Sequence, residues 1–135
     1  MATRAITQVM DGSRALLCLY RQYDGYPTGH GAELLAWARG MRITAGIGVD
    51  EALPFANGMG CFAAQMVAHF KGNVPGHFYI MPSSTSLGRM GYAYQIQEQR
   101  GRLWLVLRDP DGVMLFSGYL DDFSPNTATV AGDIQ

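Results

Sequence analysis

Residues 91–120 decide the fold, and their sequence is GYAYQIQEQRGRLWLVLRDPDGVMLFSGYL. From residue 92 to residue 97, large apolar residues alternate with small or polar ones, which is typical of a strand with one buried and one wet face. Turn sequences occupy 99–101 and 109–112, and the second of them is Asp-Pro-Asp-Gly. The pattern predicts a three-stranded antiparallel meander with strands over 91–98, 102–108 and 112–120.

Two further strands are expected near the N-terminus, over 4–10 and 15–23. The sequence Asp11-Gly12-Ser13 between them is a hairpin signal, because Asp-Gly supplies the positive φ that a tight turn needs. Both faces of the second strand are largely apolar, which is typical of a strand in the middle of its sheet. A short apolar strand is also expected over 77–81.

Two helices are expected between these groups of strands. The first covers 32–41 and repeats apolar residues at helical spacing. The second covers 61–71 and carries Phe62, Met66 and Phe70 along one stripe. The intervening stretch 40–60 has little periodicity, and a short helix is expected near 49–53, where Asp50 and Glu51 suit a first turn.

The predicted order of elements is therefore β-β-α-α-β-β-β-β. It indicates an α+β two-layer sandwich, in which an antiparallel sheet of about five to six strands carries two helices on one face. A single domain is expected over 1–124, and the small polar residues 125–135 are expected to form a flexible tail.

Composition excludes several classes of protein. The 135 residues carry a net charge of −1, and nine dispersed arginines accompany a single lysine, so no basic stripe for double-stranded nucleic acid is present. No apolar run approaches the ~18 residues of a membrane span, and the N-terminus has no secretory apolar region, so a cytoplasmic protein is expected. The low charged fraction of 16% favours self-association into a homo-oligomer.

The best candidate for a site is the segment RQYDGYPTGHG, residues 21–31, between the second strand and the first helix. Loops of this composition need special backbone angles, and binding sites are often built on them. Its candidate ligand-binding residues are Arg21, Tyr23, Asp24, Tyr26 and His30. A structural interpretation competes with this one, because the glycines and proline also suit a turn that leads the chain into the helix.

A second candidate is the backbone around Gly58 and Gly60, because amides at the start of a helix can hold a phosphate or a carboxylate. Neither Cys18 nor Cys61 belongs to a CxxC pair, so both are expected to be reduced. No HxH, HxxxH or CxxC spacing is present, so neither a metal ion nor another cofactor is predicted.

Three segments, YRQYDGYPTGHG (20–31), ANGMGCFAAQMVAHFKG (56–72) and GHFYIMP (76–82), together resemble a group of small bacteriophage and prophage proteins. Proteins of that group share a strand ending in a Tyr-x-x-Asp-Gly-Tyr-Pro motif, followed by a glycine and a helix. The resemblance extends over roughly residues 1–120. It implies a phage-associated protein in the cytoplasm of the host bacterium and nothing about catalysis.

Small proteins in that setting often act by binding. We therefore expect a non-catalytic binding protein that counters a host defence system. It would either sequester a small anionic, nucleotide-like ligand or block a host protein. The alternative is a small hydrolase or nuclease-like enzyme that uses Asp24 and His30, with Cys61 or His77 as a further participant. Binding is favoured, because these residues lack close catalytic spacing and no pair of carboxylates stands on a structured element.

Overall fold

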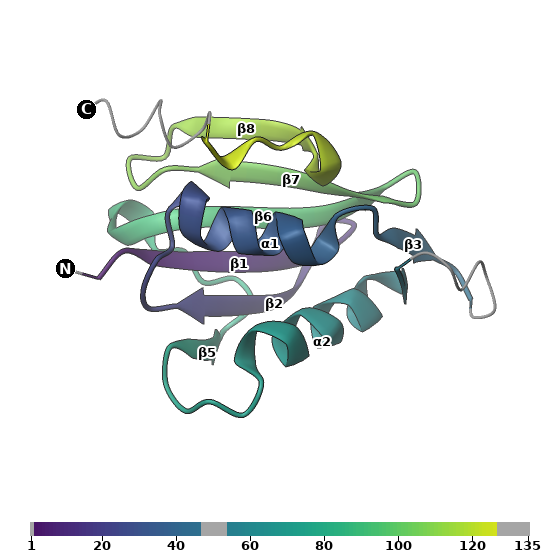
Figure 1. Ribbon diagram of the computed structural model, residues 1–135, viewed down its shortest axis with the longest axis horizontal. Helices are drawn as coiled ribbons and strands as arrows, with labels where there is room; N and C mark the ends of the chain where they lie inside the picture. Colours follow the sequence, from purple (N-terminus) through teal and green to yellow (C-terminus); the bar gives the residue numbers. More distant parts are fainter. Residues whose placement is uncertain (1, 47–53, 127–135) are drawn as a thin grey trace.

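The computed structural model describes residues 2–46 and 54–126, and in these ranges the chain forms an α+β fold of eight strands and two α-helices (Figure 1). The strands are β1 Arg4–Asp11, β2 Arg14–Arg21, β3 Arg42–Thr44, β4 Phe55–Asn57, β5 Phe78–Met81, β6 Gly91–Gln99, β7 Arg102–Arg108 and β8 Met114–Tyr119. The α-helices are α1 Ala32–Ala38 and α2 Gly58–Lys71, and short helical turns cover Pro27–Gly31, Gly88–Met90 and Leu120–Asp122.

All eight strands belong to one sheet, in which the order is β4-β3-β7-β6-β1-β2-β5 and β8 also pairs with β7. The pairs β1–β6 and β3–β4 are parallel, and the other pairs are antiparallel. The parallel pair β1–β6 joins the N-terminal hairpin to the C-terminal meander. Both α-helices lie on one side of the sheet in Figure 1, and the opposite side, here called the open face, carries no α-helix in the described ranges.

The predicted hairpin and meander are confirmed. Strands β1 and β2 pair directly, and β6, β7 and β8 are successive antiparallel neighbours. The turn after β7 closes through a hydrogen bond from the Gly112 amide to the Asp109 carbonyl oxygen, 2.9 Å long. Local signals were sufficient here, because each strand pairs with the next strand along the chain.

The prediction of an antiparallel two-layer sandwich with five to six strands is wrong in three respects. The sheet has eight strands, two of its pairs are parallel, and it curls, so that sheet and helices are not two flat layers. Strands β3 and β4 have three residues each, which is too short to leave an alternating pattern. The helix expected near 49–53 lies outside the described residues, as does most of the expected tail, from residue 127 onward.

The core fills the space between the helices and the sheet. Phe62 and Met66 of α2 are fully buried, whereas Phe70, the third residue of the predicted stripe, is only partly buried. Trp37 links the two helices, since its ring lies 5.5 Å from that of Phe62 and 6.1 Å from that of Phe70. The strands contribute fully or almost fully buried side chains to this core: Ala5, Val9, Leu19, Tyr94, Ile96, Leu105 and Leu107.

Candidate functional site

The loop after β2 is held tightly against β1. Its Gly25 amide donates to the carbonyl oxygen of Thr3 (2.9 Å), and a Cβ at Gly25 would lie 2.6 Å from the Arg4 carbonyl carbon. A Cβ at Gly29 would lie 2.3 Å from the Asp24 carbonyl oxygen. Asp24 itself has a φ of 61°, in the left-handed region that few non-glycine residues adopt. The glycines of the DGYPTG sequence are therefore required by close backbone approach, which favours the structural interpretation of the loop.

Arg21 lies beneath this loop and is 4% exposed. Its Nε donates to the carbonyl oxygen of Tyr23 (2.6 Å), and its Nη1 donates to Nδ1 of His30 (3.2 Å). Its Nη2 forms an ion pair with the Glu33 carboxylate at 2.7 Å, and the guanidinium lies 5.2 Å from the centre of the Phe78 ring. All three guanidinium nitrogens already have partners inside the protein, so this arginine is not available to an external anion.

His30 is fully buried, and its partners determine its tautomer. Because arginine can only donate, Nδ1 of His30 accepts from Arg21 and is unprotonated. The ring proton therefore resides on Nε2, which donates to Oγ1 of Thr7 at 2.6 Å. Burial, with the Arg21 charge as a smaller cause, lowers the pKa of His30 to about 3. The imidazole is neutral at physiological pH.

This arrangement does not supply the base that the hydrolase alternative needs. A general base must reach the proton that it removes, and the lone pair of His30 is buried and occupied by Arg21. The Asp24 side chain accepts instead from the hydroxyl of Tyr26 (3.1 Å), and this hydrogen bond raises the pKa of Tyr26. Within residues 2–46 and 54–126, no group of three or more His, Cys, Asp or Glu side chains is arranged to hold a metal ion.

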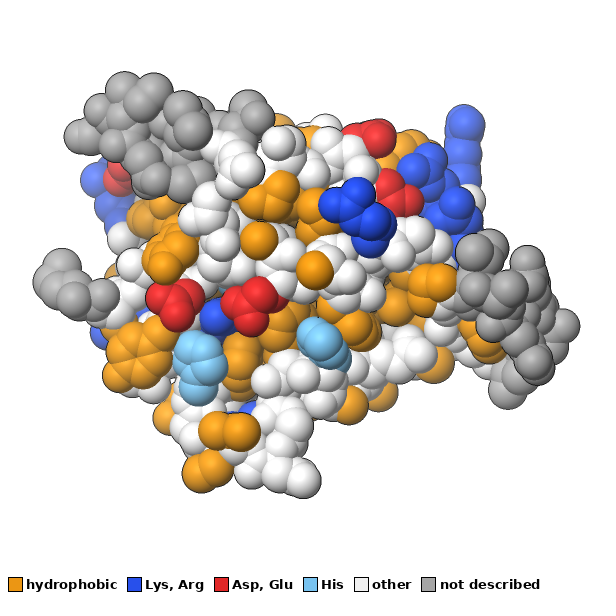
Figure 2. All heavy atoms as spheres, in the orientation of Figure 1, with side chains coloured by type: hydrophobic (Ala, Val, Ile, Leu, Met, Phe, Trp, Pro, Cys, Tyr) orange, Lys and Arg blue, Asp and Glu red, His pale blue; other side chains and the backbone are white. Residues whose placement is uncertain are grey.

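The outer rim of the loop carries acidic groups. The side chain of Glu33 is 53% exposed and Asp24 is also exposed, and Figure 2 shows acidic side chains beside a cation and a histidine near the start of α1. The His77 ring stacks on the Tyr23 ring, with ring centres 5.8 Å apart, and the backbone φ of His77 is 68°. Burial, and to a smaller extent the Arg21 charge, lowers the pKa of His77. Two carboxylates at this rim disfavour an anionic ligand there.

Gly58 and Gly60 lie far from the loop. They stand in the first turn of α2, whereas the last turn of this helix meets the loop through a 5.0 Å ring contact between Phe70 and His30. A helix of 14 residues is roughly 20 Å long at 1.5 Å per residue. The structure thus brings together Arg21, Tyr23, Asp24, Tyr26 and His30, and it separates them from the two glycines.

The two cysteines differ in their surroundings. Cys18 is buried in β2, and desolvation raises the pKa of its thiol to about 11. Cys61 is an exposed free thiol in the first turn of α2, at the end of that helix away from the loop. The participation of Cys61 that the hydrolase alternative considered therefore has no geometric support.

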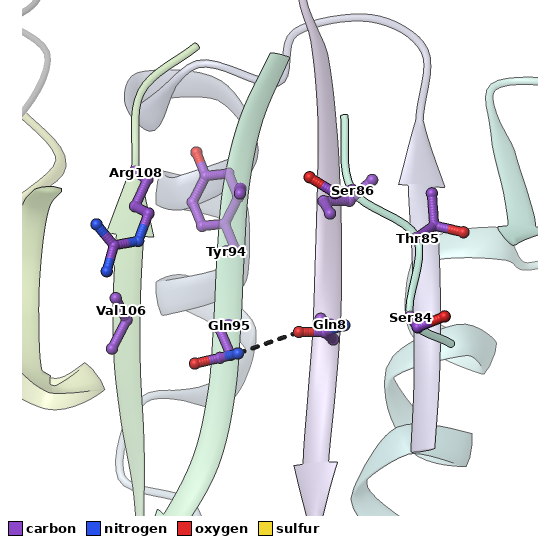
Figure 3. A pocket seen from close by; sticks show the side chains of 10 residues that line it. Gln8, Ser84, Thr85, Ser86, Tyr94, Gln95, Val106 and Arg108 are labelled. Carbon is purple, nitrogen blue, oxygen red and sulfur yellow. Dashed lines mark hydrogen bonds between the residues drawn. The ribbon is translucent and has the colours of Figure 1, made fainter. Parts of the chain in front are cut away.

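A cleft of about 380 Å³ lies elsewhere, on the open face, and the sequence pattern did not reveal it. Its floor is formed by Ile6 and Gln8 of β1 and by Ala93 and Gln95 of β6, which alternate with residues facing the helices. The parallel register puts Gln8 opposite Gln95, and Gln95 Nε2 donates to Gln8 Oε1 at 3.1 Å. Gln8 Nε2 in turn donates to the Ser83 carbonyl oxygen at 2.8 Å, so both amides are held in position. Figure 3 draws the bond between the two glutamines.

The walls of this open-face cleft come from opposite sides of the floor (Figure 3). Ser84, Thr85 and Ser86, in the segment after β5, form one wall, and Val106 and Arg108 of β7 form the other. The guanidinium of Arg108 makes one long hydrogen bond, 3.3 Å from Nη1 to the Gly112 carbonyl oxygen, among the described residues. In contrast to Arg21, this exposed arginine retains donors that can bind a ligand.

A second cavity of about 270 Å³ adjoins the first. It is lined by the segment Leu87–Arg89 and by the turn Asp109–Gly112, and it shares Ser86, Ala93 and Arg108 with the open-face cleft. Sequence patterns indicated that Gln95 faces water and that 109–112 is a turn. They could not indicate that β1, β6, β7 and the segment after β5 meet at one place, because that depends on pairing between distant segments.

Comparison with protein-family models, with curated proteins and with solved structures found no match to this chain. No helix in the part of the chain that the structure describes is long and apolar enough to cross a membrane.

Proposed function

We propose that this protein is a non-catalytic binding protein that holds a small anionic ligand in the open-face cleft. The observation that carries the proposal is the pairing of Arg108, whose guanidinium makes one long hydrogen bond to the part of the chain that the structure describes, with a floor of two oriented amides. A volume of about 380 Å³ lies within the range of small-molecule sites. The anion is assigned to this cleft instead of the loop, because Arg21 is neutralised inside the protein and the loop rim is acidic.

Binding is favoured over catalysis by the chemistry of the lining. Among the described residues that line the open-face cleft there is no carboxyl, imidazole, thiol or amine group. The hydroxyl of Tyr94, a residue that also borders the cleft, donates to the Gly25 carbonyl oxygen (2.9 Å), and burial strongly raises its pKa. Serine hydroxyls without a base are weak nucleophiles. These groups can bind and orient a ligand, and they do not provide an acid–base pair for the hydrolase alternative.

The biological role follows from the resemblance to small phage proteins and is part of the same proposal. A protein that binds a small anion without converting it can remove that anion from solution. In the cytoplasm of a bacterial host, this protein would sequester a nucleotide-like signal on which a defence system depends.

The test is calorimetric titration of the protein with adenosine 5′-monophosphate and with inorganic phosphate, together with two arginine variants. Arg108→Gln removes the cation of the cleft, and we expect at least about tenfold weaker binding, as loss of a charged hydrogen-bonding group produces. Arg39→Gln removes an exposed arginine next to α1, on the other side of the sheet, and should bind like the unaltered protein. Absence of binding to these two anions and to singly charged phosphodiesters, or equal binding by the two variants, would contradict the proposal.

A further inference from the structure

The two cavities of the open face meet at Arg108. Ile6 of β1 pairs with Ala93 of β6, and Ala93 pairs with Arg108 of β7, so these residues form one row across three strands. Both Ala93 and Arg108 line both cavities. In this row, the small methyl group of Ala93 separates Ile6 from Arg108. A ligand held at Arg108 can therefore extend in two directions along the sheet.

The first direction leads to the amide of Gln95. One hydrogen of its Nε2 is used by Gln8, which leaves one donor and the Oε1 acceptor for a ligand. Glutamine presents such a donor and acceptor pair to the edge of a nucleobase when it recognises adenine. The orientation of Gln95 is fixed by Gln8 and, through it, by the Ser83 carbonyl oxygen. This half of the site suits a planar heterocycle that offers both a donor and an acceptor.

The second direction leads to a cavity of nearly balanced charge. Arg89 and Arg108 line it, and so do Asp109 and Asp111 of the turn after β7. The Asp109 carboxylate already accepts from the amides of Asp111 and Val113, both at 2.9 Å. Two cations and two carboxylates disfavour a ligand group with two negative charges. A phosphate monoester carries nearly two charges at neutral pH, whereas a phosphodiester carries one.

From this arrangement we infer that the ligand consists of two nucleosides joined by a phosphodiester. Its phosphate lies at Arg108, one base lies on Gln95, and the second nucleoside occupies the cavity beside Arg89. This inference rests on the proposed function, since it assumes that the open-face cleft binds an anion. It adds that both cavities are filled by one molecule.

The experiment compares three probes by calorimetry on the full chain: adenosine 5′-monophosphate, the linear dinucleoside phosphate ApA, and cyclic di-AMP. We expect at least one of the two diesters to bind about tenfold or more tightly than the monophosphate. Arg89→Ala removes a side chain of the second cavity, and it should weaken the binding of the diesters more than the binding of the monophosphate. Gln95→Leu should lower the affinity for every one of these probes that binds to the unaltered protein. The matched control, Arg39→Gln, should change none of these affinities.

The outcomes separate this inference from the proposed function. If the monophosphate binds as tightly as both diesters, and Arg89→Ala weakens all probes equally or not at all, the two-nucleoside ligand is ruled out while the anion site stands. If none of the three probes binds and inorganic phosphate does not bind either, both proposals are wrong. Circular dichroism of each variant shows whether it is folded, so that a loss of binding can be assigned to the site.

Discussion

At the scale of single residues, two arginines with similar positions at strand ends have opposite roles. Arg21 is enclosed by Tyr23, His30 and Glu33, and it ties the loop to the sheet. Arg108 stands on the other face of the sheet, is exposed and makes one long hydrogen bond to residues within 2–46 and 54–126. Arginine suits both roles, because its planar fork can either join several internal acceptors or bind an external anion. Burial and the number of internal partners together distinguish the structural arginine from the candidate ligand-binding one.

The buried imidazole of His30 leads to a prediction about pH. Its pKa is lowered from the ordinary 6.5 to about 3 in the folded protein. Between these two pH values the unfolded chain binds a proton that the folded protein does not. The free energy of unfolding therefore decreases as the pH falls through this window. The full stabilisation from the neutral His30 is present above pH 6.5. We expect a slope on the order of 1 kcal/mol per pH unit from this group. Urea unfolding at several pH values between 4 and 7 measures it.

The matched variant for this measurement is His30→Gln, because a neutral amide can accept from Arg21 and donate to Thr7 without titrating. This variant should lose less stability than the unaltered protein as the pH falls. His69→Gln, which replaces an exposed histidine of α2 instead, is the control for the change from histidine to glutamine. Parallel stability curves for the unaltered protein and His30→Gln would show that His30 is not held neutral by the fold.

At the scale of elements, α2 connects the core to the loop. Its first three turns bury Met59, Phe62 and Met66, and its last turn brings Phe70 against the rings of His30 and Phe78, at 5.0 and 5.5 Å. The helix is therefore anchored mostly in its N-terminal and central turns. The apolar stripe is continuous in sequence, but its burial decreases toward the loop.

Because burial decreases along α2, we predict that two equal truncations in this helix reduce the free energy of unfolding by different amounts. Phe62→Ala removes a fully buried ring that packs on Trp37 and should reduce the free energy of unfolding by about 3–5 kcal/mol. Phe70→Ala removes a partly buried ring and should cost clearly less. Guanidinium chloride unfolding of both variants measures the difference. Equal losses would mean that the C-terminal turn of α2 is as firmly part of the core as its centre.

At the scale of the whole molecule, β5 is an edge strand of the sheet, with no neighbour on its outer side among the described residues. This strand pairs with β2 on one side, and its Tyr79 and Ile80 are 46% and 58% exposed. Exposed strand edges can pair with other chains, and lysine side chains commonly prevent this. The chain's single lysine, Lys71, donates to the carbonyl oxygens of Gly76 (3.0 Å) and Phe78 (2.9 Å), and Pro82 follows the strand. These features protect both ends of the β5 edge.

Removal of this protection should promote association. Lys71→Met keeps the aliphatic stem and deletes the ammonium group, which leaves two carbonyl oxygens at the edge without their donor. We expect more dimers or larger species than in the unaltered protein at the same concentration, as measured by sedimentation velocity. Lys71→Arg retains a cationic donor and serves as the control. If Lys71→Met sediments as the unaltered protein does, Lys71 does not protect the edge.

The amino-acid sequence by itself determined the features that depend on near neighbours. Alternation and turn residues predicted β1, β2 and the β6–β8 meander, and helical spacing predicted α2, because strands joined by tight turns and residues four apart on a helix interact locally. The gathering of the loop residues around His30 also follows from their proximity in the chain.

The tertiary structure alone decided the parallel pairing of β1 with β6, and with it the open-face cleft. Gln8 and Gln95 are 87 positions apart, and no local period encodes their contact. It also decided that α2 points its C-terminal end at the loop, which places Gly58 and Gly60, the second candidate, at the far end of the helix. The physical reason is common to both: a period along the chain specifies which face of an element is buried, whereas packing specifies which elements meet and in which direction.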